Sequence, residues 1–189
     1  QVAEQFQTGA LVALPTDASY VLACHLEDRT AVDRMRQLRG IDEKHLLTLL
    51  CRDLSELSQY AQVDNRQFRF LKEWTPGAYT FILPATREVP RRLMHPSRKT
   101  VGLRVPEAPI VQALLAELGV PLLCASLILP GDENPLSDPD DIEDRIGKRI
   151  DLLVDGGAGQ LEATSVIDVT GDEPVIQRVG LGPVEAMLR

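Results

Sequence analysis

The stretch ALVALPTDASYVLAC, residues 10–24, contains two short apolar runs separated by a polar segment. The first run, Ala10–Leu14, predicts a buried strand that ends at a proline, because proline cannot donate a hydrogen bond to a sheet. The second run, Tyr20–Cys24, predicts another buried strand. Thr16 and Asp17 lie between them, just past a strand end. Ligands of mixed α/β sheets favour the crevice beyond strand ends, so we expect polar residues there to contribute to a site.

Similar apolar runs recur along the chain and alternate irregularly with helical patterns. Further strands are predicted at Leu46–Cys51, Ala78–Leu83, Thr100–Val105, Pro121–Ala125, Leu152–Val154, Thr164–Val169 and Pro174–Gln177. Helices are predicted at Ala31–Arg39, Asp53–Tyr60, Asp64–Trp74, Ala108–Leu118 and Asp138–Ile146. Because this order is not a strict βαβ alternation, the predicted fold class is α/β (α+β), with a twisted mixed β-sheet flanked by helices.

The composition is that of a globular protein. The chain has 189 residues, of which 44% are hydrophobic and 25% are charged, so we expect a single domain over residues 1–189. It begins with glutamine, and we therefore expect that a short natural N-terminal segment is missing. The longest apolar runs are far shorter than the roughly 20 residues of a membrane helix, so we expect no membrane partner. The start carries no signal-peptide pattern, which favours a cytoplasmic location.

The three cysteines and three histidines form no recognisable site. Cys24, Cys51 and Cys124 each stand in an apolar context, which predicts buried free thiols in a reducing compartment. The histidines are not spaced as metal ligands, and the chain has no phosphate-binding glycine-rich motif of the common kinds. We therefore expect no metal site and no permanent cofactor.

Charge is distributed unevenly along the chain, whose net charge is −8. Asp132–Asp144 holds seven acids and no base, which leaves −1 for the rest. By contrast, Arg87–Arg104 holds six bases and one acid. A net acidic chain argues against nonspecific coating of nucleic acid, but one local basic surface remains compatible with it. The basic run therefore predicts either an ordinary solvated face or an RNA-facing surface made of Arg87, Arg91, Arg92, Arg98 and Lys99.

Polar residues recur just past the predicted strand ends. They are Thr16, Arg104, Ser126, Thr164, Ser165 and Arg178. Guanidinium groups offer paired donors and hydroxyls offer further donors, so together these residues suit a polyanion such as a nucleotide phosphate. Taken singly, each is also an ordinary turn or cap residue. The segment Arg39–His45 adds three cations in seven residues, and it predicts either an anion contact or an exposed loop.

The order of these segments resembles the YrdC/YciO family, which has the threonylcarbamoyl-AMP synthase fold. Six segments match the family in order, and they cover nearly the whole chain. PTDASY (15–20) resembles PTDTVYG, EWTPGAYT (73–80) resembles FWPGPLT, and VGLRVP (101–106) resembles VAVRVP. LLCAS (122–126) resembles the approach to SAN, TSVID (164–168) resembles STVVD, and RVG (178–180) resembles the closing RxG. The resemblance implies a YrdC-like domain with a concave ligand groove.

Two departures from the family pattern concern nucleotide binding. The synthases have a KxR motif where this chain has Arg39-Gly40-Ile41, so the second cation is lost. They have SxN where this chain has Ser126-Leu127-Ile128, so the asparagine is lost. With these departures the chain is closer to the YciO branch than to the synthases.

The resemblance implies one of two functions. One is a weakened threonylcarbamoyl-AMP synthase that uses threonine, bicarbonate and ATP with Mg²⁺ as substrates, linked to tRNA modification. The other is a non-catalytic module that binds a nucleotide, tRNA or other double-stranded RNA.

The resemblance also implies roles for individual residues. Arg39 and Arg178 would pair with phosphates, while Ser126 and Ser165 would hydrogen-bond the nucleotide or the amino acid. Thr16 would contact the threonine-like substrate. His45 would lie near both subsites. Arg104 would reach the ligand or hold the strand end. No catalytic residue is assigned.

Overall fold

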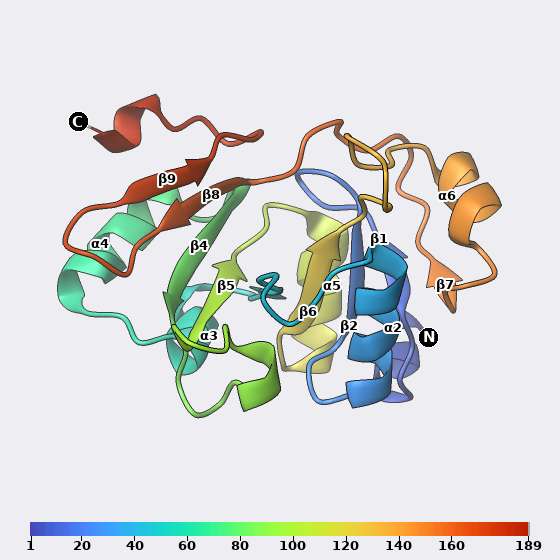
Figure 1. Ribbon diagram of the computed structural model, residues 1–189, viewed down its shortest axis with the longest axis horizontal. Coiled ribbons are helices and arrows are strands. Elements are labelled where there is room, and N and C mark those ends of the chain that lie inside the picture. Colours follow the sequence, from blue (N-terminus) through green and yellow to red (C-terminus); the bar gives the residue numbers. More distant parts are fainter. Residues whose placement is uncertain (189) are drawn as a thin grey trace.

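The computed structural model describes residues 1–188, and within them nine strands form one sheet in the order β7-β1-β2-β6-β3-β5-β4-β8-β9 (Figure 1). The strands are β1 Val12–Leu14, β2 Val21–His25, β3 Thr48–Leu50, β4 Tyr79–Pro84, β5 Thr100–Arg104, β6 Leu122–Ser126, β7 Leu152–Leu153, β8 Ser165–Asp168 and β9 Val175–Arg178. Parallel pairing joins β1 to β7, β3 to β5 and β4 to β8, and the remaining neighbours are antiparallel.

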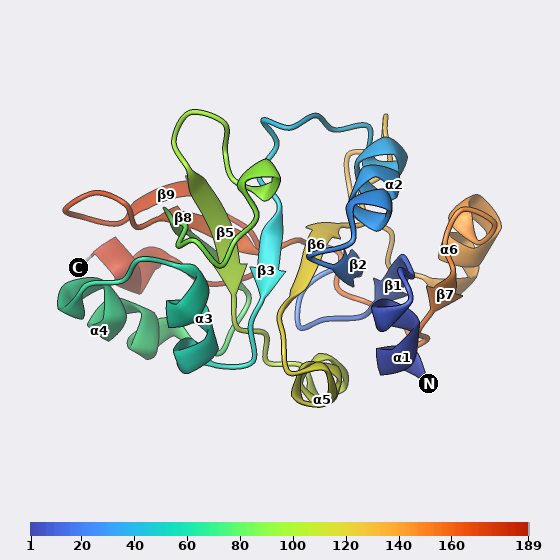
Figure 2. The same cartoon turned by 90° about the horizontal axis from the view of Figure 1, so that it is seen from below.

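Helices connect and cover the strands. They are α1 Val2–Gln7, α2 Arg29–Arg39, α3 Leu54–Tyr60, α4 Asn65–Trp74, α5 Pro109–Leu118 and α6 Pro139–Ile146, with 3-10 turns at Arg91–Leu93 and Glu185–Leu188. Within the described residues, none of these helices is both long and apolar enough to cross a membrane. The two termini lie at opposite ends of the molecule (Figures 1 and 2).

The predicted mixed sheet with flanking helices is confirmed, and each predicted strand and helix has a counterpart. Helix α1 was not predicted. It has only six residues and buries only Ala3 and Phe6, so its sequence carries no long helical periodicity. Its visible signal is the capping box in which Gln1 and Glu4 bond each other's backbone.

The sheet is twisted, so that one and the same face points in different directions at its two ends. Backbone pairing aligns Cys24, Leu123, Leu49, Leu103, Phe81 and Ile167 across six strands, and all six lie in one hydrophobic core. Helix α2 covers this face beside β2, and α3 and α4 cover it farther along the sheet. Because neighbouring strands rotate by roughly 20–25°, the covering helices lie on opposite sides of the molecule in Figure 2.

The opposite face is covered along only part of its width. There a second core, which includes Phe6 of α1 and Val111 and Leu115 of α5, packs against β1, β2 and β6. Farther along, the same face of β4 and β8 opens on a cavity. The three cysteines are free and buried, as predicted. Burial raises the pKa of Cys124 to about 11, and it raises the pKa values of Cys24 and Cys51 as well.

Tyr20 links the segment between β1 and β2 to the glycine-rich loop after β7, residues 156–159. Its hydroxyl donates to the Gly157 carbonyl at 2.7 Å and accepts from the Gly156 amide at 3.1 Å. Gly159 lies against the Tyr20 ring so closely that a Cβ there would come within 2.7 Å of it. One buried side chain therefore holds the turn that carries Thr16 and the loop after β7 together.

We expect Tyr20→Phe to lower the free energy of unfolding by about 1–3 kcal/mol, because it leaves two backbone groups without their partner. Urea denaturation followed by circular dichroism measures the change. Tyr60→Phe is the matched control, since no hydrogen bond of its hydroxyl occurs within residues 1–188; it should change stability by less than about 0.5 kcal/mol. Equal effects of the two variants would contradict the role given to Tyr20.

Candidate functional site

A cavity of about 190 Å³ lies on the uncovered part of the sheet. Strands β2, β3, β4, β5, β6, β8 and β9 and the loop after α2 all contribute to its walls. Its polar lining residues are His45, Thr48, Thr80, Arg104, Ser126, Thr164, Gln177 and Arg178. Basic and hydroxyl side chains from distant parts of the sequence therefore meet at one place.

Gly102 lies beneath the cavity, where it packs closely against two residues that line it. In the sheet register, Thr48 of β3 is opposite Gly102 of β5, and Gly102 is opposite Ile82 of β4. A Cβ at Gly102 would lie 2.8 Å from Oγ1 of Thr48 and 3.1 Å from Cγ2 of Thr80. Neither contact leaves room for a side chain, so the glycine is needed for the observed packing of the floor.

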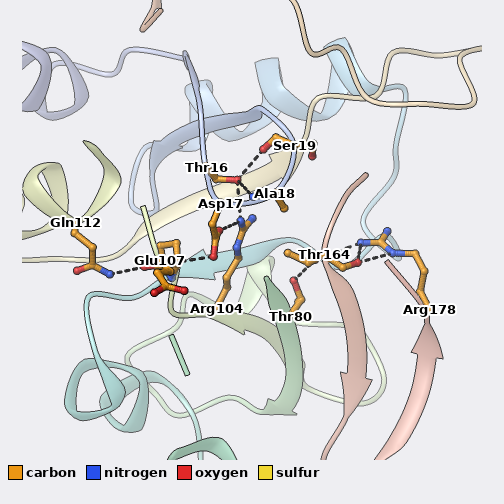
Figure 3. Close-up of polar contacts among 11 residues, drawn as sticks. Thr16, Asp17, Ala18, Ser19, Thr80, Arg104, Glu107, Gln112, Thr164 and Arg178 are labelled. Atoms are coloured by element: carbon orange, nitrogen blue, oxygen red, sulfur yellow. Dashed lines mark hydrogen bonds and ion pairs between the residues drawn. The ribbon is translucent and has the colours of Figure 1, made fainter. Parts of the chain in front are cut away.

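Arg104 occupies the inner wall of the cavity and is almost completely buried, with 3% of its surface exposed. Its Nη2 donates to Oγ1 of Thr16 at 2.8 Å and to Oδ1 of Asp17 at 2.5 Å (Figure 3). Its buried Nε has no hydrogen-bond partner in the part of the chain that the structure describes. An unpaired buried donor costs free energy, so this group is suited to a ligand acceptor.

Thr16 is used inside the protein. Its hydroxyl donates to the Ser19 carbonyl at 2.8 Å and accepts from the Ala18 amide at 3.0 Å, in addition to the bond from Arg104. A hydroxyl has one donor and two acceptor positions, so these three bonds fill its capacity. The structure therefore places Thr16 as a support for Arg104, and a hydroxyl contact to a ligand would require one of these bonds to break.

Arg178 reaches the cavity from the edge strand β9. Its Nε and Nη2 donate to the Thr164 carbonyl at 3.0 and 2.7 Å. Thr164 shares a hydrogen bond of 2.7 Å with Thr80, and Figure 3 shows these three residues in one line beside Arg104. This chain of contacts fixes one side of the guanidinium of Arg178.

Arg39 and Ser165, two other predicted site residues, lie behind the cavity wall. Arg39 donates through Nη1 to the backbone carbonyl of Ser126 at 2.6 Å, so it holds a residue that lines the cavity. Ser165 is fully buried, donates to the Gly182 carbonyl at 2.5 Å and accepts from the Gly180 amide at 2.9 Å. Its neighbour Thr164 faces the cavity in its place.

The charges around the cavity repel one another. Burial lowers the pKa of Arg39, and so does nearby Arg178. Burial lowers the pKa of Arg178, with Arg104 adding to the effect. Partial burial is the main cause that lowers the pKa of His45. The positive charges of Arg39, Arg36 and Arg178 lower it further. Cations that depress one another's pKa values are relieved by an anion, so the site suits an anionic ligand.

Several site residues were not predicted from the sequence. Thr48 and Thr80 lie within strands, where a threonine ordinarily indicates only strand propensity. The sequence places Asp17 beside Thr16 just past a strand end, but it carries no signal that assigns Asp17 to the site. The signal that could have found Thr80 is its alternation with Tyr79 and Phe81, which places its side chain on the opposite face.

No metal-binding cluster occurs among residues 1–188, where no three His, Cys, Asp or Glu side chains are grouped as ligands. The cavity itself is lined by cationic, hydroxyl and apolar side chains.

The basic run lies apart from the cavity lining. Its five members, Arg87, Arg91, Arg92, Arg98 and Lys99, are all exposed on the connection between β4 and β5. Arg92 donates through Nη2 to the Leu26 and Glu27 carbonyls at 3.4 and 3.2 Å, which ties this connection to the end of β2. Arg87, Arg91 and Lys99 line a separate cavity of about 380 Å³.

The two positions that depart from the synthase pattern are apolar here. Ile41 packs partly buried against the main core. Ile128 lines a neighbouring cavity of about 180 Å³ together with Asn134, Leu161 and Val179. Arg178 lines both this cavity and the 190 Å³ cavity on the sheet, so these two cavities share a wall.

Comparisons with known proteins agree with these observations. A sequence model of the Sua5/YciO/YrdC family, described as telomere recombination, matches residues 4–180. The protein YciO of Escherichia coli is 50% identical over 188 residues, and the alignment covers 100% of this chain, to the nearest per cent, and 91% of YciO. Its crystal structure superimposes with a TM-score of 0.96 over 99% of this chain and 91% of that one.

Two other relatives are synthases or carry a ligand. A threonylcarbamoyl-AMP synthase of Vibrio vulnificus is 27% identical, and the alignment covers 94% of this chain and 96% of the synthase. The crystal structure of P. abyssi Sua5 complexed with L-threonine is 26% identical, with a TM-score of 0.89. That match covers 98% of this chain and 55% of Sua5.

We expect the affinity for inorganic pyrophosphate to fall as the pH rises through the titration of His45. In the free protein the pKa of His45 is lowered from its usual 6.5, mainly by partial burial and then by the neighbouring arginines. A bound anion favours the protonated ring and raises this pKa, so binding takes up protons. The decline should begin below pH 6.5 and end above the pKa of the complex. Isothermal titration calorimetry in buffers of different ionisation enthalpy measures both effects.

His45→Gln should flatten this pH dependence, while His25→Gln at the end of β2 should leave it in place. A profile that keeps its slope in His45→Gln would contradict the assignment.

Proposed function

The chain belongs to the Sua5/YciO/YrdC family, and we propose that it binds ATP and a small amino acid in the basic cavity and joins them, with bicarbonate, into a carbamoyl-adenylate. The relatives supply the reaction class, since synthases of threonylcarbamoyl-AMP are among them. We take the amino acid to be threonine, and the support is that the related P. abyssi Sua5 is complexed with L-threonine. The residues of this chain supply the anion site.

An excess of positive charge around the cavity is the observation that carries this proposal. Arg104 has one carboxylate partner, Asp17, and its buried Nε is unpaired among residues 1–188, while Arg178 lines the same cavity and forms no ion pair in that range. Buried charges in proteins are paired with counter-charges or hydrogen-bonded, so this surplus favours an anion. A polyphosphate provides several negative oxygens, which can accept from more than one guanidinium group.

The neighbouring cavity gives the rest of the nucleotide a place. Ile128, Leu161 and Val179 are among its apolar lining residues, and Asn134, Glu133 and Glu162 add polar groups that can accept from the base or the ribose. Since Arg178 borders both spaces, the phosphates would occupy the basic cavity and the nucleoside would extend past Arg178 into the second one. Apolar walls with a few polar groups are typical of small-molecule sites.

The reaction requires little covalent chemistry from the protein. The amine of threonine combines with bicarbonate to give a carbamate and water. A carbamate oxygen then attacks the α-phosphorus of ATP, one P–O bond forms, and pyrophosphate leaves as another P–O bond breaks. The arginines of this chain would orient the phosphates and offset their charge, which is the main source of catalysis in such transfers. We assign Mg²⁺ to the nucleotide, as part of the substrate.

The apolar residues Ile41 and Ile128 make this activity weaker than that of the synthases. A charge-assisted hydrogen bond contributes roughly 1.5–3 kcal/mol. Loss of one cation and one amide contact therefore lowers binding or rate by about 10- to 1,000-fold, unless other groups replace them.

The reaction is tested by incubating the purified protein with ATP, Mg²⁺, threonine and bicarbonate, while each component is omitted in turn. Pyrophosphate release that depends on threonine, together with the mass of the adenylate, would support the proposal. Binding of ATP without turnover would reduce the function to nucleotide binding. No binding of ATP at low salt would overturn it.

Arg178→Gln should weaken ATP binding by about 10- to 100-fold, because a charge-assisted contact to phosphate is lost. The residue lies on an exposed edge strand, so the variant should still fold, although it loses the bonds of Arg178 to Thr164. Isothermal titration calorimetry measures the affinity. Arg66→Gln on the surface of α4 is the matched control and should bind ATP as the unaltered protein does. An unchanged affinity in Arg178→Gln would remove this residue from the site.

A second candidate function is RNA binding by the basic run. Its five cations are exposed and lie within thirteen residues. The bonds from Arg92 to two carbonyls hold the connection between β4 and β5 against the end of β2. A fixed row of cations of this kind favours contact with phosphate backbones, whose affinity is strongly salt-dependent.

If this run binds RNA, the double variant Arg91→Ala/Arg98→Ala should reduce the affinity for a double-stranded RNA and lower the slope of its salt dependence by about 2. Fluorescence anisotropy over a salt series measures both. Lys148→Ala/Arg149→Ala, exposed after α6 and away from the run, is the control of equal charge. Equal loss in both double variants would indicate a nonspecific charge effect, and no RNA binding at low salt would exclude this function.

A further inference from the structure

The carboxylate of Asp17 joins two parts of the chain at the inner end of the cavity. Its Oδ1 accepts from Nη2 of Arg104 at 2.5 Å, and its Oδ2 accepts from the backbone amide of Glu107 at 2.9 Å. The Asp17 side chain is 12% exposed and that of Arg104 is 4% exposed. The pair therefore lies largely out of water, where a hydrogen-bonded ion pair keeps a defined geometry.

The hydrogen-bond donors of Arg104 divide into two groups. A guanidinium has five N–H donors, and in Arg104 the two on Nη2 are used by Thr16 and Asp17. Three remain, on Nη1 and Nε, and the buried Nε–H is unpaired among the described residues. Among the described residues, only Nη2 of the Arg104 guanidinium is hydrogen-bonded. The bonds from Nη2 to Thr16 and Asp17 therefore set the orientation of the planar group, and with it the direction of the donors on Nη1 and Nε.

The backbone around Arg104 is fixed by the same carboxylate. The Arg104 carbonyl accepts from the Cys51 amide at 2.8 Å, and the Val105 carbonyl accepts from the Gly77 amide at 3.0 Å. Glu107 then turns back to donate to Asp17. Asp17 thus bonds both the side chain at the end of β5 and the turn that follows it, so neither can shift alone.

We propose that Asp17 is a positioning residue for anion binding, and that it acts by aiming the free donors of Arg104 into the cavity. This inference rests on the proposed function, in which the cavity holds the phosphates of ATP. It makes a distinctive claim, because a carboxylate close to an anion site repels the anion. If Asp17 acted only through its charge, its removal would strengthen anion binding. If it positions Arg104, its removal weakens binding.

Asp17→Asn separates these two possibilities by the sign of the effect. The variant keeps the size of the side chain and removes its charge. It has one oxygen for two N–H donors, so its amide nitrogen must face either Arg104 or the Glu107 amide, which are both donors. We expect the affinity for inorganic pyrophosphate and for ATP, measured by isothermal titration calorimetry, to fall at least tenfold. A rise in affinity would overturn the proposal.

Two variants serve as controls. Glu107→Gln removes a nearby carboxylate but keeps the backbone amide that bonds Asp17, so it should leave affinity unchanged or slightly higher. Asp17→Glu restores the charge and both oxygens at a longer reach, and we expect it to recover part of the affinity. Should Asp17→Asn fail to fold, Thr16→Val removes the other acceptor of Nη2 and should show a loss in the same direction.

A second readout does not depend on ligand binding. In ¹⁵N spectra of the arginine side chains, the buried Nε–H of Arg104, assigned by its loss in Arg104→Lys, should give a slowly exchanging signal. In Asp17→Asn this signal should broaden or exchange rapidly, while the signals of Arg34 and Arg145 stay as they are. If the unaltered protein binds neither pyrophosphate nor ATP, the proposed function fails, and this spectrum still decides the role of Asp17. An unchanged Arg104 signal would overturn the positioning role.

Discussion

The structure depends on a buried cation that must be paired. Arg104 is carried by β5, and its side chain is almost wholly removed from water. An isolated charge in that position would cost several kcal/mol, so a carboxylate and a hydroxyl must reach it. They come from the turn between β1 and β2, and strands β6 and β3 separate β2 from β5 in the sheet. The pairing of Arg104 therefore links the end of β5 to the turn between β1 and β2, across two intervening strands.

The twist of the sheet explains why the cavity exists. Helices α2, α3 and α4 cover the same face, yet the rotation of the strands places them on opposite sides of the molecule. The other face is covered by α1 and α5 only where it meets β1, β2 and β6. Its remaining part carries polar Thr48 and Thr80 and apolar Ile82 and Val166, and Gly102 between Thr48 and Ile82 has no side chain to fill the space. The fold and the site are thus two results of the same geometry.

The sequence predicted much of the fold because its strands and helices carry local signals. Apolar runs ended by Pro15 or Pro106 gave the strands, and the motif order indicated the family. The site was harder to predict, because it depends on register between distant segments. Ser165 and Thr164 are adjacent in sequence, and only the pairing of β4 with β8 determines which of them faces the cavity. The saturated hydroxyl of Thr16 likewise becomes visible only when Arg104, 88 positions away, is placed beside it.

The location of Arg178 has a consequence for the persistence of the site. Arg104 belongs to an interior strand with neighbours on both sides, whereas Arg178 belongs to β9, which ends the sheet and pairs with β8 alone. Edge strands open by local fluctuations that cost less free energy than global unfolding, and their amides exchange with solvent sooner. The two arginines that line the cavity therefore have different lifetimes in place. We therefore expect the inner half of the site to be as persistent as the core, and the outer half to open more often while the protein stays folded.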